Sequence, residues 1–211
     1  YKEGIVEAFQ QKLKSDNVKK ATLKITALGL YEADLNGKKV GDALFTPGFT
    51  YYPTHLYYQT YDVTGMLTGE DNLTVYLAQG WYCGRFTFDN KVQIYGEHPA
   101  VSWILTVEDK NGVHTFCSDD PSVDAISSSY EYAGFYDGEV YNENRERDII
   151  QPVKFEGHIP NLFEEGTMSV RIREEMPVKT ITRRGDVTIL DFGQNFAGII
   201  TIDPAKMNGE R

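Results

Sequence analysis

The sequence is poor in cysteine and in positive charge, and each shortage excludes a class of protein. Its 211 residues include two cysteines, Cys83 and Cys117, too few for a disulfide framework, so both are expected to be free thiols. Lysine and arginine number 21 against 31 acidic residues, which gives a formal net charge of −10. Nucleic-acid backbones and anionic membrane surfaces both require clustered positive charge, so neither is an expected partner.

Long apolar runs and familiar catalytic signatures are also missing. No segment approaches the roughly 20 consecutive apolar residues that span a bilayer. The sequence does not open on a basic and then apolar signal peptide, which favours a cytoplasmic over a secreted location. It has no nucleophile elbow, phosphate-binding loop or dinucleotide fingerprint, and its four histidines lack metal-ligand spacing. We therefore expect no catalytic residue within these 211 residues.

Alternating apolar and polar residues dominate what is present. Residues 21–27, 72–78 and 101–109 have the period of two that is typical of half-buried strands. Asn36-Gly37 and Asn111-Gly112 are strong hairpin signals between such runs. Many short strands separated by turn residues predict an all-β protein, either a sandwich or a barrel. Only residues 3–17 are ambiguous, since they fit a short helix or an irregular strand.

The character of the sequence changes near residue 142. Residues 142–166 contain two prolines and many charges, without clean periodicity. We predict a first domain over residues 1–150, a linker or crossover over 151–168, and the beginning of a second, truncated β domain over 169–211. A sheet unit of this size with an open edge is marginal alone, so the sequence is expected to be a fragment of a longer protein.

The stretch YLAQGWYCGRFTFDN, residues 76–90, is the first candidate site. Trp81 and Tyr82 stand between glycines at the end of a predicted strand, and Asp89 and Asn90 follow. In one interpretation Trp81 plugs the end of the fold and the glycines permit a tight turn. In the other, the aromatic faces stack on a sugar ring while Asp89 and Asn90 bond its hydroxyl groups.

The second candidate is YDGEVYNEN, residues 136–144. Asp137 opens a turn, and Glu139 and Asn142 follow within five residues. The structural interpretation is a turn that enters an edge strand. In the functional interpretation these three side chains supply oxygen atoms to a sugar or to Ca²⁺. A third stretch, LDFGQNFAGII at residues 190–200, is expected to be a self-bonded turn without a ligand.

Several motifs together resemble a known family. ALGLYEADLNGKKVGD, TPGFTYYPTHLYYQTYDVTGML, GWYCGRF, YDGEVYNEN and LDFGQNFAGIITI occur in an order and spacing similar to the N-terminal region of bacterial α-L-rhamnosidases, which are glycoside hydrolases. The resemblance implies an antiparallel β-sandwich of carbohydrate-binding-module type, jelly-roll or galactose-binding-like, followed by a partial second β-sandwich unit. It also implies an (α/α)₆ catalytic barrel elsewhere in the parent chain, with no catalytic residue here.

The resemblance has consequences for ligands, and the sequence departs from the family at several of them. Some members bind rhamnose with the help of calcium. The matching positions here are Asp42, Asp89 and Asn90, with Asp42 and Asn90 as possible calcium ligands and no cofactor strictly required. Asn142 replaces an acidic residue usual in the family, which weakens the case for a cation, and Phe49 replaces a usual Trp.

Three functions are compatible with these observations. The first is a non-catalytic fragment that braces the catalytic domain of its parent α-L-rhamnosidase and binds rhamnose-containing glycans or glycosides. The second is a purely structural interdomain or dimerisation module without a ligand. The third is a free-standing lectin-like protein. Convergence of Trp81, Asp89, Asn90 and Glu139 in space would favour the first, and their divergence or burial would favour the second.

Overall fold

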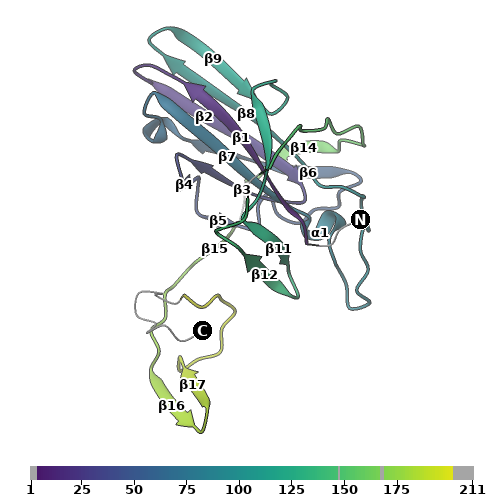
Figure 1. Cartoon of the computed structure of the whole chain (residues 1–211), viewed down its shortest axis with the longest axis vertical. Coiled ribbons are helices and arrows are strands. Elements are labelled where there is room, and N and C mark those ends of the chain that lie inside the picture. The colour runs from purple at the N-terminus through teal and green to yellow at the C-terminus, as the bar shows by residue number, and fades with distance from the viewer. Residues whose placement is uncertain (1–3, 147, 167–168, 202–211) are drawn as a thin grey trace. The chain divides into compact units, whose positions relative to one another are not determined.

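The computed structural model describes residues 4–146, 148–166 and 169–201, and these residues form an almost entirely β structure (Figure 1). The chain divides into two compact units, Tyr1–Val170 and Arg171–Arg211. Strand β15 (Val170–Arg171) lies at the junction between them. The domain boundaries at 150 and 168, inferred from composition, stay predictions.

Two sheets make up most of the first unit. One has the strand order β13 (Ile149–Ile150), β10 (Val123–Ser127), β1 (Val6–Lys14), β7 (Glu70–Ala78), β3 (Leu30–Leu35) and β4 (Lys38–Lys39). The other has the order β14 (Asn161–Glu164), β6 (His55–Asp62), β2 (Lys20–Leu28), β8 (Ala100–Asp109) and β9 (Gly112–Cys117). All neighbours pair antiparallel except β14, which runs parallel to β6.

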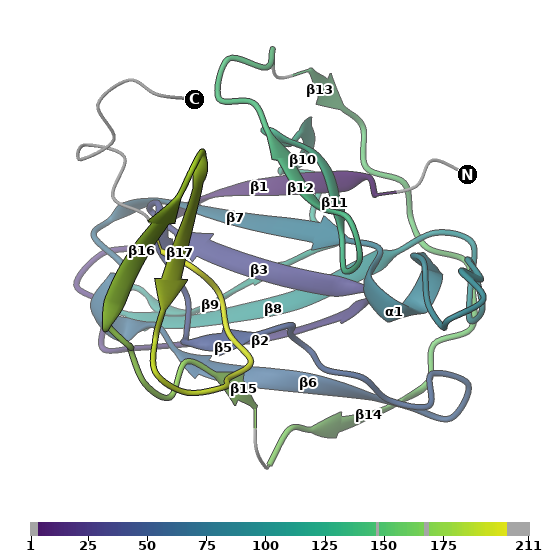
Figure 2. The ribbon, with the colours of Figure 1, turned by 90° about the horizontal axis from the view of Figure 1, so that it is seen from below.

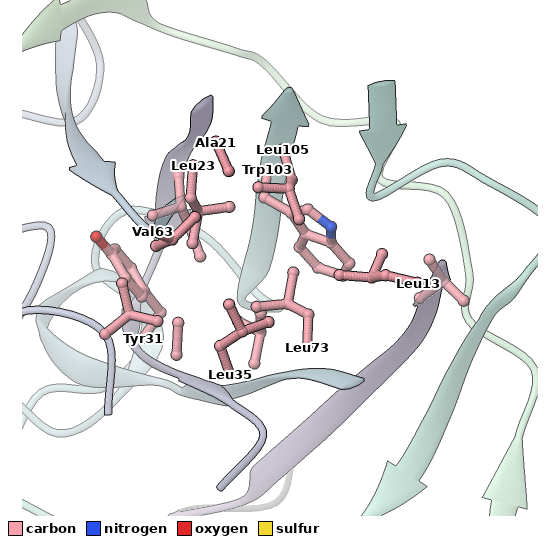
Figure 3. Close-up of a cluster of buried hydrophobic side chains, with 14 of the residues drawn as sticks. Leu13, Ala21, Leu23, Tyr31, Leu35, Val63, Leu73, Trp103 and Leu105 are labelled. Atoms are coloured by element: carbon pink, nitrogen blue, oxygen red, sulfur yellow. The ribbon is translucent and has the colours of Figure 1, made fainter. Parts of the chain in front are cut away.

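The space between the sheets is filled by apolar side chains that alternate inward (Figure 3). Leu23 from β2, Leu73 from β7 and Leu105 from β8 are each 1% exposed. Trp103 is the largest of these buried groups, and its indole N–H donates a 3.0 Å hydrogen bond to Gln11 Oε1 of the opposite sheet. The sandwich expected from the sequence is confirmed, and the barrel alternative is not.

Both predicted hairpins are present. Asn36 and Gly37 join β3 to β4 with φ of 56° and 72°, the left-handed conformations that a tight two-residue turn requires. Asn111 and Gly112 lie at the turn between β8 and β9. Residues 62–72, expected to be a helical turn or loop, contain the 3₁₀ helix η1 (Thr64–Met66).

The helical interpretation of residues 3–17 is wrong. Strand β1 pairs with β7 over its whole length and with β10 over five residues, so it lies inside the sheet. The predicted crossover is also more ordered than its composition indicated. Its residues 161–164 form β14, an edge strand of the five-stranded sheet.

Three further elements lie close to the candidate site. They are β5 (Ala43–Leu44), the helix α1 (Gly80–Cys83), and the hairpin of β11 (Tyr130–Gly134) and β12 (Gly138–Tyr141). Figure 2 shows α1 at one end of the sandwich strands. In the part of the chain that the structure describes, no helix is long and apolar enough to cross a membrane.

The second unit contains one antiparallel hairpin among its described residues, β16 (Thr180–Arg184) paired with β17 (Val187–Asp191). The turn that follows is self-bonded as expected, because the backbone N–H of Gly193 donates to Asp191 Oδ1 at 2.7 Å. The truncated second β domain over residues 169–211 stays a prediction.

Candidate functional site

The site begins where β7 ends and the chain turns sharply into α1. Gly80 makes this turn with a φ of 51°, and a Cβ at this position would collide with Leu30. The backbone N–H of Gly84 closes the single helical turn by donating to the carbonyl of Gly80 at 3.1 Å. The expected strand end is therefore a short helix, and the two aromatics that it carries point into different surroundings.

Tyr82 belongs to a second, smaller core at this end of the sandwich. It is 7% exposed and packs at 5.3 Å from the ring of Tyr52, with Leu56 and Cys83 in the same buried cluster. Burial, followed by the negative charge of Glu7, raises the pKa of the Cys83 thiol to about 12, so the thiol stays protonated. Tyr82 thus has little surface to offer a ligand and supports α1 from within.

Trp81 lies at the centre of an exposed group of rings, which we call the aromatic surface: Phe45, Phe49, Trp81, Phe86 and Phe135. The Trp81 ring stacks on Phe135 with centroids 4.6 Å apart and an interplanar angle of 27°. Phe45 and Phe49 meet Trp81 edge-on at 6.2 Å and 5.9 Å. Phe45, Phe49 and Phe135 remain 43%, 48% and 39% exposed, so their rings form the outer part of the aromatic surface.

An ion pair beside the aromatic surface connects α1 to the tip of the β11–β12 hairpin. Arg85 Nη2 lies 2.9 Å from Asp137 Oδ2, and the Tyr132 hydroxyl donates to the same oxygen at 2.9 Å. Two donors on one carboxylate oxygen fix its orientation more strictly than a lone surface ion pair would. The structure thereby brings Asp137 next to the segment that carries Trp81.

Asp89 and Asn90 lie on the exposed turn that follows. Phe86 and Lys91 bridge the base of this turn, and the Asn90 backbone N–H donates to the Thr87 carbonyl at 3.2 Å. The Asp89 side chain is 77% exposed, and its Oδ2 lies 3.8 Å from Lys91 Nζ. Both candidate side chains therefore face solvent, and Phe86 connects their turn to the aromatic surface through its contact with Phe49.

Glu139 and Asn142 lie further along the hairpin. Glu139 is exposed on β12, where its charge acts on Tyr130. The Asn142 side-chain amide donates to Glu131 Oε1 at 2.7 Å, and its oxygen accepts from the Asn144 backbone N–H at 3.1 Å. Asn142 is therefore committed to hydrogen bonds within its own segment.

The candidate calcium ligands Asp42, Asp89 and Asn90 supply few oxygen atoms at any one place. Calcium takes about six to eight oxygen ligands. Asp89 and Asn90 place two oxygen-bearing side chains on one turn, whereas Asp42 lies in a different segment, just before β5. Among the residues that the structure describes, no group of three or more His, Cys, Asp or Glu side chains could hold a metal ion.

Sequence reasoning missed Phe45, Phe135 and Arg85 as members of the site. All three lie in loops or at the edges of short elements, where no periodicity marks them. Phe45 has a φ of 57°, which is uncommon for an aromatic residue, but the sequence does not display this. Large aromatics in Gly- and Pro-containing loops are the signal that could have identified the two phenylalanines.

Comparison with known proteins places this geometry in a family. The α-L-rhamnosidase N-terminal domain matches residues 16–176. The α-L-rhamnosidase of Streptomyces avermitilis is 34% identical over 205 residues, which cover 90% of this chain and 20% of that enzyme. An α-L-rhamnosidase of an Alteromonas species is 30% identical over 212 residues, which cover 92% of this chain and 23% of that enzyme.

Solved structures of α-L-rhamnosidases are also similar to this chain. The crystal structure of the Streptomyces avermitilis α-L-rhamnosidase complexed with L-rhamnose superposes with a TM-score of 0.78 and 31% identity, covering 92% of this chain and 20% of that one. The crystal structure of the native α-L-rhamnosidase from Aspergillus terreus superposes with a TM-score of 0.76 and 29% identity, covering 90% of this chain and 24% of that one. The chain spans about a fifth of the length of the curated relatives it matches. It belongs to the α-L-rhamnosidase N-terminal domain family.

Proposed function

We propose that this chain is the non-catalytic N-terminal part of an α-L-rhamnosidase, which removes terminal α-L-rhamnose from glycosides, and that it binds rhamnose-containing glycans. The family membership and the names of the relatives support the parent activity. The catalytic residues belong, in this proposal, to the larger part of the parent, since this chain matches only about a fifth of its relatives.

The observation that carries the binding proposal is the aromatic surface together with the polar groups beside it. The C–H face of a sugar ring packs on aromatic rings, and its hydroxyl groups require hydrogen-bonding partners at the rim. Phe45, Phe49 and Phe135 supply the rings, and Trp81 holds them in place. The ion pair of Arg85 and Asp137 lies beside the aromatic surface and supplies the polar groups.

Asp89 and Asn90 complete the proposed site from the neighbouring turn. A carboxylate accepts hydrogen bonds from sugar hydroxyls, and an amide both donates and accepts them. The carboxylate of Asp89 and the amide oxygen of Asn90 are also calcium ligands by type, but they are too few to hold the ion alone, so the proposed contacts are made to the sugar directly. Tyr82 has a supporting role beneath α1, and Asn142 a structural one in its own segment.

Tryptophan fluorescence tests this proposal because the chain has two tryptophans with different exposure. Trp103 is 2% exposed in the core, whereas Trp81 is half-buried within the aromatic surface. Acrylamide quenching in the whole chain therefore reports chiefly on Trp81. We expect L-rhamnose to protect this fluorescence in a saturable way, because a bound sugar covers the aromatic surface.

Two variants locate the binding. Asp89→Ala is expected to weaken the protection by L-rhamnose about tenfold, the loss of one charge-assisted hydrogen bond. Asp124→Ala removes an exposed carboxyl group from β10 and is expected to behave as the wild type. Protection that is absent in the wild type, or that both variants weaken equally, would reject the site.

A second candidate function is bracing of the rest of the parent enzyme. The loop after α1 exposes Phe88 completely, and Val92 and Ile94 by 36% and 40%. Large apolar side chains exposed on one loop favour a protein neighbour. Phe88→Ser should leave L-rhamnose protection unchanged, and it should lower the melting temperature of the parent enzyme if bracing is the role.

A further inference from the structure

A second group of aromatic side chains lies on the outer face of the six-stranded sheet. Leu73, Val75 and Leu77 of β7 point into the core, so the alternation of the strand directs Tyr76 to the opposite face. The ring of Tyr130, from β11, packs edge-on against Tyr76 at 6.1 Å and 86°. We call this group, with the third ring described next, the tyrosine surface.

The third ring comes from β12. Tyr141 is paired with Tyr130 across the hairpin, and the two rings lie 5.1 Å apart at 66°. Tyr141 is 57% exposed, whereas Tyr76 and Tyr130 are half-buried. The tyrosine surface therefore joins the outer face of the sheet to one face of the hairpin, and Figure 2 shows β11 and β12 beside β7.

The hairpin that carries two of these rings is fixed at several points. The backbone N–H of Ala133 donates to the Gly4 carbonyl at 2.8 Å, and the N–H of Asn142 donates to the Ser129 carbonyl at 2.8 Å. Arg145 Nη1 donates to the Ser128 carbonyl at 2.8 Å. A surface held in this way loses little conformational entropy when a ligand binds.

Carboxylates flank the rings on both sides. Glu32 is the cross-strand partner of Tyr76 on β3, and Glu139 precedes Tyr141 by two residues on the same face of β12. Burial, and after it the charges of Glu139 and Glu32, raise the pKa of Tyr130. Its hydroxyl therefore stays protonated at neutral pH and can donate a hydrogen bond.

These groups select the charge of a ligand. Lys39 Nζ is paired with Glu32 Oε1 at 2.6 Å. Arg145 Nη1 is committed to the carbonyls of Ser128 and Tyr130, at 2.8 Å and 3.3 Å. The chain as a whole carries a formal charge of −10. An anionic ligand would meet net repulsion here, whereas a neutral polyhydroxylated ring could use the tyrosine faces for its C–H groups and the carboxylates for its hydroxyls.

We propose that the tyrosine surface, with Glu32 and Glu139, binds a further neutral sugar unit of the glycan whose terminal rhamnose occupies the aromatic surface. The β11–β12 hairpin connects the two places, since its tip carries Phe135 and Asp137 and its strands carry Tyr130 and Tyr141. The inference rests on the proposed function for the identity of the ligand as a glycan. It adds a second contact region and a requirement for neutral sugars.

The test compares L-rhamnose with a neutral tetrasaccharide of rhamnose units, each titrated into the whole chain by calorimetry. We expect Tyr141→Ala to leave the affinity for L-rhamnose unchanged and to weaken tetrasaccharide binding about fivefold or more, the value of one aromatic contact. Tyr136→Ala is the matched control, because Tyr136 lies on the same hairpin and is 58% exposed. Glu139→Gln is a second variant, and we expect it to lower the affinity for the tetrasaccharide but not the affinity for L-rhamnose.

The inference is overturned if Tyr141→Ala and Glu139→Gln bind the tetrasaccharide as the Tyr136→Ala control does. It is also overturned if an oligogalacturonate of the same length binds as tightly as the neutral tetrasaccharide. Binding of a lysine-rich peptide that depends on Tyr141, without any effect of Tyr141 on the tetrasaccharide, would assign the surface to a basic protein segment instead. Failure of the proposed function has a different signature, since L-rhamnose would then not bind the wild type.

Discussion

Trp81 and Phe135 stack with their ring centroids 4.6 Å apart, and this contact joins α1 to the tip of the β11–β12 hairpin. The two residues come from different parts of the first unit, so their contact positions the candidate site. The exposed ion pair of Arg85 and Asp137 repeats the same connection a few residues away.

Phe135→Ala should weaken both the fold and the site. The stacked pair is expected to contribute about 1 kcal/mol beyond the area it buries, so the free energy of unfolding should fall by about 1–2 kcal/mol. Affinity for L-rhamnose should fall about tenfold, because Trp81 loses the ring that holds its orientation. Urea unfolding and calorimetric titration measure the two effects. Tyr136→Ala, one residue further, should change neither, and equal effects of both variants would contradict this role for Phe135.

The ion pair between Arg85 and Asp137 should matter more for positioning than for stability. Its side chains are 28% and 41% exposed, and such pairs contribute about 0.2–1 kcal/mol. Asp137→Asn should therefore lower the free energy of unfolding by less than about 1 kcal/mol. Amide signals of residues at the hairpin tip should nevertheless shift and broaden in NMR spectra. A loss of several kcal/mol would mean that the pair is part of the core fold instead.

Asp71 should make stability depend on pH in the acid range. It is 4% exposed, and burial would raise its pKa, but hydrogen bonds from Asn36, Thr68 and Gly69 bring the pKa below the ordinary 3.8. A lowered pKa in the folded state means that the ionised carboxylate stabilises the fold above pH ~4, and that this contribution disappears as the pH falls through the folded pKa.

Asp71→Asn measures this contribution. We expect it to lower the free energy of unfolding by about 2–3 kcal/mol at pH 6, because an amide nitrogen replaces one acceptor oxygen and the charge that strengthens the remaining hydrogen bonds is lost. The difference from the wild type should shrink as the pH falls from ~4 through the lowered folded pKa, where the wild-type carboxylate becomes protonated. Urea midpoints across pH give the curve. Asp124→Asn, at an exposed position on β10, is the control for replacing one carboxyl group by an amide. A difference for Asp71→Asn that is independent of pH would contradict the assignment.

Thr87→Gly should stabilise the chain. Thr87 is β-branched and has a φ of 69°, and its hydroxyl is buried without a hydrogen-bond partner among the described residues. Relief of both features should exceed the added flexibility of glycine in the unfolded chain by about 1 kcal/mol. Asn90→Gly is the comparison, since asparagine tolerates its φ of 53° and little should change. A lower melting temperature for Thr87→Gly would show that the turn requires the threonine.

The sandwich could be predicted where one face of a strand is apolar and the other polar. Residues of β2, β7 and β8 display this alternation, and Asn36-Gly37 displays its turn chemistry. Strand β1 does not display this alternation of apolar and polar residues, for a physical reason. Its core-facing Gln11 is polar because it accepts the Trp103 hydrogen bond, and its outward Ala8 is 1% exposed. Both faces of β1 thus depart from a simple period of two.

The candidate site was predictable only in part. Trp81, Asp89 and Asn90 could be singled out because aromatics between glycines and a polar turn are local features. The rings around Trp81 could not, because Phe45 and Phe135 reach it through tertiary packing that leaves no periodic trace. The burial of Tyr82 is also tertiary, since it depends on Tyr52 and Leu56. Adjacent aromatics in one short helix can face solvent and core, and their order in the sequence does not say which is which.

Calorimetric titration of L-rhamnose into the whole chain tests the central claim most directly. The titration should be done in a buffer containing calcium and repeated after chelation. The side-chain oxygens of Asp89 and Asn90 can accept hydrogen bonds from a sugar or coordinate a cation, and chelation separates the two. We expect saturable heat in both buffers, because the proposed contacts do not require calcium, and Asp89→Ala should weaken the affinity about tenfold. The absence of heat up to millimolar sugar in both buffers would contradict this expectation, and the aromatic surface would then be assigned to contact with the rest of the parent enzyme.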